Sequence, residues 1–63
     1  MNTKPIVKLI GEDGNVFNLI AICSTALKKV NQYDLAKRMQ DEVFASKSYN
    51  EALAIMAKYC EIE

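Results

Sequence analysis

Few side chains in this sequence could take part in chemistry: two cysteines and two adjacent pairs of carboxylates. The 63 residues include no histidine, the usual general base and proton carrier of enzymes. The carboxylate pairs are Glu12-Asp13, in a glycine-flanked turn, and Asp41-Glu42, on the expected outer face of a helix. Turn formation and solvation account for both pairs without catalysis. The sequence therefore predicts a protein that is not an enzyme.

The cysteines, Cys23 and Cys60, lie far apart in the sequence, each within an apolar stretch. Two cysteines without a histidine cannot complete an ordinary structural zinc set. Free cysteine packs as a small hydrophobic residue. We therefore expect both thiols to be reduced and buried in the core, with no metal and no cofactor.

The segment Gly11-Glu12-Asp13-Gly14-Asn15 invites three motif interpretations, and each fails on a required residue. A calcium loop starting at Asp13 would need glycine where Asn18 stands. A phosphate-binding loop would end in Gly-Lys-Ser/Thr, and a dinucleotide fingerprint would have a third glycine. The acidic pair also opposes anion binding, so the segment is interpreted as a turn.

Two basic pairs, Lys28-Lys29 and Lys37-Arg38, could approach each other across the turn between two expected helices. The simpler interpretation is a solvated face that complements the end of a helix dipole. The functional hypothesis is that these four residues dock an unknown protein partner. Eight basic residues balance eight acidic ones and the pI is about 6.2, so nucleic-acid binding is not expected.

The N-terminal run Ile6 to Ile10 is rich in β-branched residues and ends at a glycine, which favours a strand. Val7 and Leu9 would face the core, and Ile6 and Ile10 would lie on the other side with Lys8. Such a strand must pair with another strand, because unpaired backbone groups attract partners. Either the C-terminal residues or a second copy of the chain could supply that partner.

The following segment allows two interpretations. Asp13-Gly14 between two apolar runs is a hairpin signal, which would make residues 16–22 a second strand. The longer pattern favours a helix with Asn15 as its N-cap. Its apolar residues recur at helical spacing over four turns: Val16, Ile20, Cys23, Leu27 and Val30.

Two more helices are expected. Asn31 is the predicted N-cap of a helix from Gln32 to about Ala45, and Ser48 with Glu51 matches a capping box for a helix from residue 49 to about 59. The inward face of this last helix would hold Leu53, Met56, Ala57 and Cys60. The final residues 60–63 alternate apolar and acidic, which is typical of a short edge strand. The predicted fold is a single α+β domain over residues 1–63, mostly helical, in the order β-α-α-α-β, with the short C-terminal strand paired with the first.

No N-terminal apolar region of the signal-peptide kind and no apolar run near the length of a membrane span occurs in the sequence. We therefore expect a cytoplasmic protein without a membrane partner.

Residues 7–17, VKLIGEDGNVF, are followed by a predicted helix that ends Ala26-Leu27-Lys28-Lys29. Together with the closing segments SYNE (residues 48–51) and CEIE (residues 60–63), this pattern resembles a group of short uncharacterised proteins from bacteria, their phages and mobile elements. The resemblance covers nearly the whole chain. It implies a strand-turn-helix start and a bacterial or phage origin, and it assigns no site.

These observations favour a non-enzymatic protein-interaction module, such as a regulator or inhibitor encoded by a phage or mobile element. The alternative is a dimeric DNA-binding regulator of ribbon-helix-helix type, in which two strands pair across a dimer and enter the major groove. Lys4 and Lys8 would then face DNA. Against it stand the five-residue turn, the third helix, the acidic tail and the apolar outer face of the strand.

Overall fold

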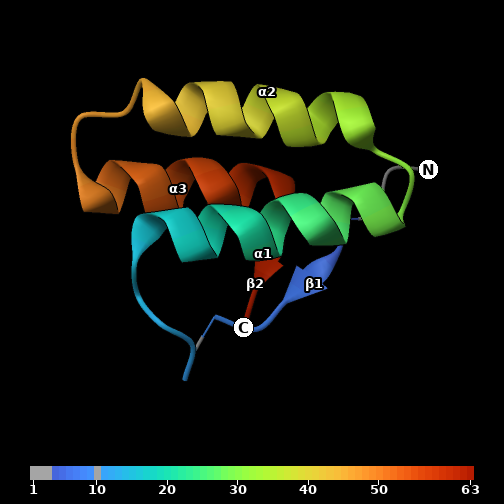
Figure 1. Cartoon of the computed structure of the whole chain (residues 1–63), viewed down its shortest axis with the longest axis horizontal. Coiled ribbons are helices and arrows are strands. Elements are labelled where there is room, and N and C mark those ends of the chain that lie inside the picture. The colour runs from blue at the N-terminus through green and yellow to red at the C-terminus, as the bar shows by residue number, and fades with distance from the viewer. Residues whose placement is uncertain (1–3, 10) are drawn as a thin grey trace.

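The chain folds as a strand, three helices and a second strand, with the two strands side by side below the helices (Figure 1). The computed structural model describes residues 4–9 and 11–63. The elements are β1 (Ile6–Val7), α1 (Val16–Lys29), α2 (Tyr33–Phe44), α3 (Tyr49–Tyr59) and β2 (Glu61–Ile62). The predicted order β-α-α-α-β is confirmed, and the hairpin alternative for residues 16–22 is wrong. The first strand is shorter than expected, and Ile10 lies outside the described residues.

The strands β1 and β2 pair in parallel, with Ile6 opposite Glu61. Three backbone hydrogen bonds accompany this register: Glu61 N–H to the Pro5 carbonyl oxygen at 2.8 Å, Glu63 N–H to that of Val7 at 2.8 Å, and Leu9 N–H to that of Glu63 at 3.0 Å. Parallel neighbours need a long connection between them, which the three helices provide. The predicted pairing of the two ends of the chain is therefore confirmed.

One apolar core is built from β1, the three helices and Cys60, which lies between α3 and β2. Its buried members are Val7, Leu19, Ile20, Cys23, Leu27, Ala36, Met39, Val43, Ala52, Met56 and Cys60. The predicted α1 stripe is confirmed from Ile20 to Leu27, whereas Val30 is exposed because α1 ends at Lys29. Ala57 was expected to face inward and is exposed. The buried residues Ala52, Met56 and Cys60 recur every four positions and so lie on one face of α3. Ala57 lies about 100° around the helix from Met56 and is therefore off that face.

Two of the three predicted helix caps are confirmed. The Asn15 side chain accepts a hydrogen bond from Phe17 N–H at 2.8 Å, and Ser48 Oγ accepts one from Glu51 N–H at 3.0 Å. Both bonds satisfy amides that the first helical turn leaves free.

Asn31 does not cap α2, which begins after Gln32 without a side-chain cap. Asn31 instead has a φ of 65° and terminates α1. Its N–H bonds the Lys28 carbonyl oxygen at 3.0 Å, and Gln32 N–H bonds that of Leu27 at 2.9 Å. This is the Schellman arrangement, in which asparagine can replace glycine at the left-handed position.

The turn before α1 is held by side chains. Asp13 Oδ1 accepts a hydrogen bond from Asn15 N–H at 3.0 Å, which confirms a structural role for this carboxylate. The Tyr49 hydroxyl donates to the Gly14 carbonyl oxygen at 2.5 Å. This bond ties the turn to the first residue of α3, which is far away in the sequence.

We expect Tyr49→Phe to lower the free energy of unfolding by about 1 kcal/mol, because it removes one intramolecular hydrogen bond and little apolar surface. Urea denaturation followed by circular dichroism measures the change. Tyr33→Phe is the matched control, since Tyr33 is also exposed and at the start of a helix. Equal stability of the two variants would contradict the proposed link between the turn and α3.

Candidate functional site

The four basic residues of the predicted docking site are all exposed. Lys28 and Lys29 occupy the last turn of α1, where cations complement the helix dipole. Lys37 Nζ lies 3.7 Å from an Asp41 carboxylate oxygen one turn further along α2. Lys29 borders a groove beside β1, whereas Arg38 borders a separate hollow at the start of α2. These residues therefore do not surround one concave site, and their role in docking stays a prediction.

A different surface gathers exposed aromatic side chains. The rings of Phe17, in the first turn of α1, and Phe44, in the last turn of α2, have centroids 6.1 Å apart and are tilted by 40°. Phe17 is 65% exposed and Phe44 61%. With Tyr49 they border a cleft of about 260 Å³ that we call the aromatic cleft. Its other lining residues are Val16, Ile20, Val43, Ser46, Ser48 and Ala52.

The aromatic cleft carries no charge. The two serine hydroxyls on its rim are engaged locally, Ser46 Oγ with the Val43 carbonyl oxygen and Ser48 with the backbone of α3. What remains accessible is mainly aromatic and aliphatic surface. An exposed group of large apolar side chains in a small protein indicates a binding surface.

A second concave surface lies between β1 and α1. This groove, which we call the β1 groove, has a volume of about 530 Å³. Its lining comes from residues 5–8 on one side and from the outer face of α1 on the other, namely Ala21, Ile22, Thr25, Ala26 and Lys29. The α1 residues recur at helical spacing and lie beside the buried stripe that faces the core.

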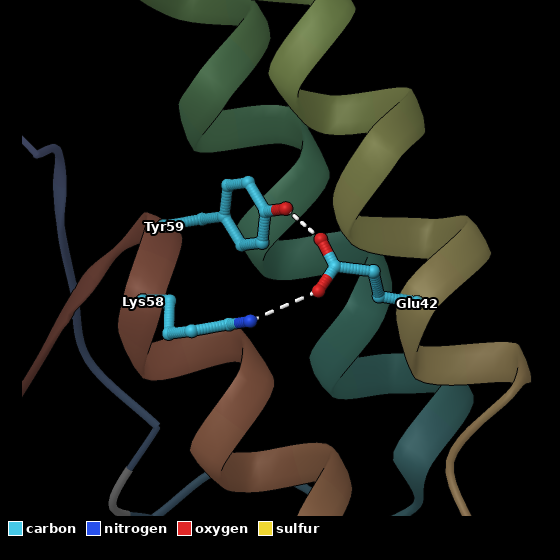
Figure 2. A network of polar contacts seen from close by, with 3 residues as sticks. All are labelled: Glu42, Lys58 and Tyr59. Atoms are coloured by element: carbon cyan, nitrogen blue, oxygen red, sulfur yellow. Dashed lines mark hydrogen bonds and ion pairs between the residues drawn. The ribbon is translucent and has the colours of Figure 1, made fainter.

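Glu42 is the centre of a polar network between α2 and α3 (Figure 2). One carboxylate oxygen lies 2.9 Å from Lys58 Nζ, and the other accepts a hydrogen bond from the Tyr59 hydroxyl. The sequence interpretation placed Glu42 on a solvated outer face, but its side chain is only 35% exposed. Both oxygens have partners in adjacent side chains, so the carboxylate joins two helices.

Both thiols are buried in the core, as their apolar contexts predicted, and the structure adds that the two cysteines are neighbours there. Cys23 and Cys60 are both free and buried. Cys60 Sγ lies 3.8 Å from the Cys23 carbonyl oxygen, as a weak donor to it. The pKa of the Cys23 thiol is raised, chiefly by a hydrogen bond with the Cys60 thiol and to a lesser extent by burial. A protonated, buried thiol is a poor nucleophile and a poor metal ligand, so Cys23 acts in packing.

No group of three or more metal-ligating side chains is found within residues 4–9 and 11–63. In the same described residues, no helix is both long enough and apolar enough to cross a bilayer. Comparison of the chain with models of protein families, with curated proteins and with solved structures finds no match. The surfaces of the chain itself are therefore the features that can indicate a function.

The aromatic cleft and the β1 groove were both missed from the sequence. Phe17 follows Val16, which is half-buried against the core, and Phe44 follows the core residue Val43, so both phenylalanines fall off the apolar stripe of their helices. Large apolar residues off the stripe were the available signal for the cleft. The small outer residues of α1 were the corresponding signal for the groove.

We expect Glu42→Ala to lower the free energy of unfolding by about 1–2 kcal/mol, because it removes a charge-assisted hydrogen bond and an ion pair between helices. Thermal or urea unfolding measures the loss. Asp41→Ala removes the neighbouring carboxylate, whose pair with Lys37 is mostly exposed, and should change stability by less than about 0.5 kcal/mol. A loss for Asp41→Ala as large as that for Glu42→Ala would contradict the structural role of the network.

Proposed function

We propose that this chain is a non-enzymatic protein-interaction module that binds a protein partner at the aromatic cleft. The observation that carries the proposal is the contact between two phenylalanines that are each more than half exposed. The cores of protein interfaces are enriched in aromatic residues and depleted of charge, and a few such residues supply most of the binding energy. The aromatic cleft has both properties.

The chemistry of this surface favours a protein over a nucleic acid. Nucleic-acid binding depends on cations that neutralise phosphates. None of the residues that line the aromatic cleft is charged. Burial of the two rings against an apolar partner surface would remove them from water, which is the main favourable term in association.

The proposed role is that of a regulator or inhibitor encoded by a phage or mobile element, acting on a larger protein of the host or of the element. The resemblance carried by residues 7–17 and by the closing segments supports this origin. It is an argument by association, because a small domain of this kind does not define a function. A cytoplasmic location is part of the same proposal.

A dimeric DNA-binding regulator of ribbon-helix-helix type is the alternative. The open edge of β1, beside Lys8, is the feature that favours it, since a second β1 could pair there. Two observations weigh against it. One edge of β1 is already occupied by β2, and Lys4 Nζ donates to the Ala57 carbonyl oxygen at 3.1 Å instead of extending freely.

The test begins with capture of proteins by the immobilised chain from bacterial cells that encode it. A captured protein is then purified and titrated calorimetrically against variants of the chain. We expect Phe17→Ala/Phe44→Ala to weaken binding by about thirtyfold or more, because loss of one interface hot spot costs about 2 kcal/mol.

Val30→Ala/Tyr33→Ala is the matched control, since both residues are exposed, apolar and near the other ends of α1 and α2. It should leave the affinity unchanged. Replacing Lys28, Lys29, Lys37 and Arg38 by Glu tests the basic residues in the same assay. An affinity that survives the double phenylalanine variant would overturn the proposal, and retention on DNA that falls steeply with salt would support the alternative.

A further inference from the structure

The two edges of β1 differ in their hydrogen bonding. Backbone groups of Pro5, Val7 and Leu9 bond to β2 or to the residue after it. In a strand, successive residues direct their backbone groups to opposite edges of the sheet. The N–H and C=O groups of Ile6 and Lys8 therefore point away from β2. Among residues 4–9 and 11–63 no other strand pairs with this edge, which we call the open edge, and such an edge can accept a further strand.

The open edge faces the β1 groove, which has room for an added chain. Ala21, Thr25 and Ala26 place small side chains on the α1 side of the groove. Ile6 is 60% exposed, and Ile22 is half-buried at the same surface. An extended segment along β1 could thus bond to the Ile6 and Lys8 backbone and place alternate side chains against α1.

The charge of the β1 groove determines which kind of extended segment can bind there. Lys8 and Lys29 are the charged members of its lining, and no carboxylate accompanies them. A second copy of β1 would bring its own Lys8 to this edge, and like charges on adjacent strands are destabilising. An acidic strand would instead bring opposite charge to this basic lining and place its carboxylates beside Lys8.

The chain itself shows such a strand on the other edge of β1. The segment Glu61-Ile62-Glu63 alternates acidic and apolar residues and bonds to the backbone of Pro5, Val7 and Leu9. The same alternation on the open edge would direct apolar side chains to one face of the sheet and carboxylates to the other.

We propose that the β1 groove is a strand-addition site for an extended segment of a partner protein in which acidic and apolar residues alternate. The added strand pairs with Ile6 and Lys8, its apolar residues face α1, and its carboxylates lie on the face of the sheet that carries Lys8. The two surfaces share no lining residue, so this proposal stands independently of the aromatic cleft.

The test uses a synthetic acetylated and amidated peptide, TEIEVE, titrated into ¹⁵N-labelled full chain at low salt. We expect shift changes at the amides of Ile6 and Lys8 and along the outer face of α1. Hydrogen exchange at the Ile6 and Lys8 amides should slow by about tenfold or more at saturation, since each becomes a hydrogen-bond donor in a ladder. The affinity should fall as salt is added.

Further peptides examine charge and backbone pairing. TKIKVK keeps the apolar residues and reverses the charges. Two forms of TEIEVE are N-methylated, one on the odd and one on the even residues, and the form whose methyl groups face β1 cannot complete the ladder. TKIKVK and one of the two methylated forms should bind at least about tenfold more weakly. Equal binding of TKIKVK, or of both methylated forms, would overturn the proposal, as would saturation by TEIEVE without changes at Ile6 and Lys8, or no binding by TEIEVE.

Variants of the chain test whether the peptide binds in the β1 groove. Lys8→Glu/Lys29→Glu should weaken TEIEVE binding by about tenfold or more, whereas Lys28→Glu/Lys37→Glu makes the same change in charge outside the groove and should have little effect. Ala21→Trp fills the groove from an exposed position and should also block the peptide. Phe17→Ala/Phe44→Ala should leave peptide binding unchanged, so a failure of the strand-addition proposal can be distinguished from a failure of the proposal that a partner binds the aromatic cleft.

Concentration-dependent shifts at Ile6 and Lys8 without peptide would identify a second copy of the chain as the occupant and overturn the proposal.

Discussion

The parallel pairing of the two ends of the chain is the constraint on which the rest of the structure depends. Glu61 and Glu63 bond to the backbone on both sides of Val7 and so hold the only buried residue of β1 against the helices. Parallel strands cannot be joined by a tight turn, so α1, α2 and α3 must form the connection between them. Lys4 strengthens the same closure by bonding to the last turn of α3. A chain of this size buries only about 60% of its surface, so its stability depends strongly on such closure.

The same pairing accounts for one of the two surfaces that we propose as binding sites. In the two-stranded sheet, β2 occupies one edge of β1. The other edge is open beside α1, where the groove is lined by small side chains and by lysines. The aromatic cleft arises from another cause, because Phe17 and Phe44 lie at the ends of two helices, beyond the core stripe. One surface offers backbone hydrogen bonds and positive charge, and the other offers aromatic area. These properties suit two kinds of contact with protein partners.

Local patterns in the sequence predicted most of the fold. The helical spacing in α1, the Asn15 cap and the capping residue Ser48 each depend on neighbouring residues, and all three are confirmed. The prediction that Asn31 caps α2 was wrong because asparagine suits both an N-cap and a left-handed helix end. The carbonyl oxygens at the end of α1, which accept hydrogen bonds from Asn31 and Gln32, favour the second role. The partners of Glu42 and the two concave surfaces depend on which helices are neighbours in space. No spacing along one helix contains that information.

Hydrogen exchange of the wild-type chain, measured amide by amide by NMR, tests whether β1 is paired on one edge and open on the other. We expect slow exchange at Leu9, Glu61 and Glu63 and fast exchange at Ile6 and Lys8. Fast exchange at all five amides would mean that the two ends of the chain do not pair. Slow exchange at Ile6 and Lys8 in the chain alone would mean that the second edge of β1 is already covered, contrary to the structure described.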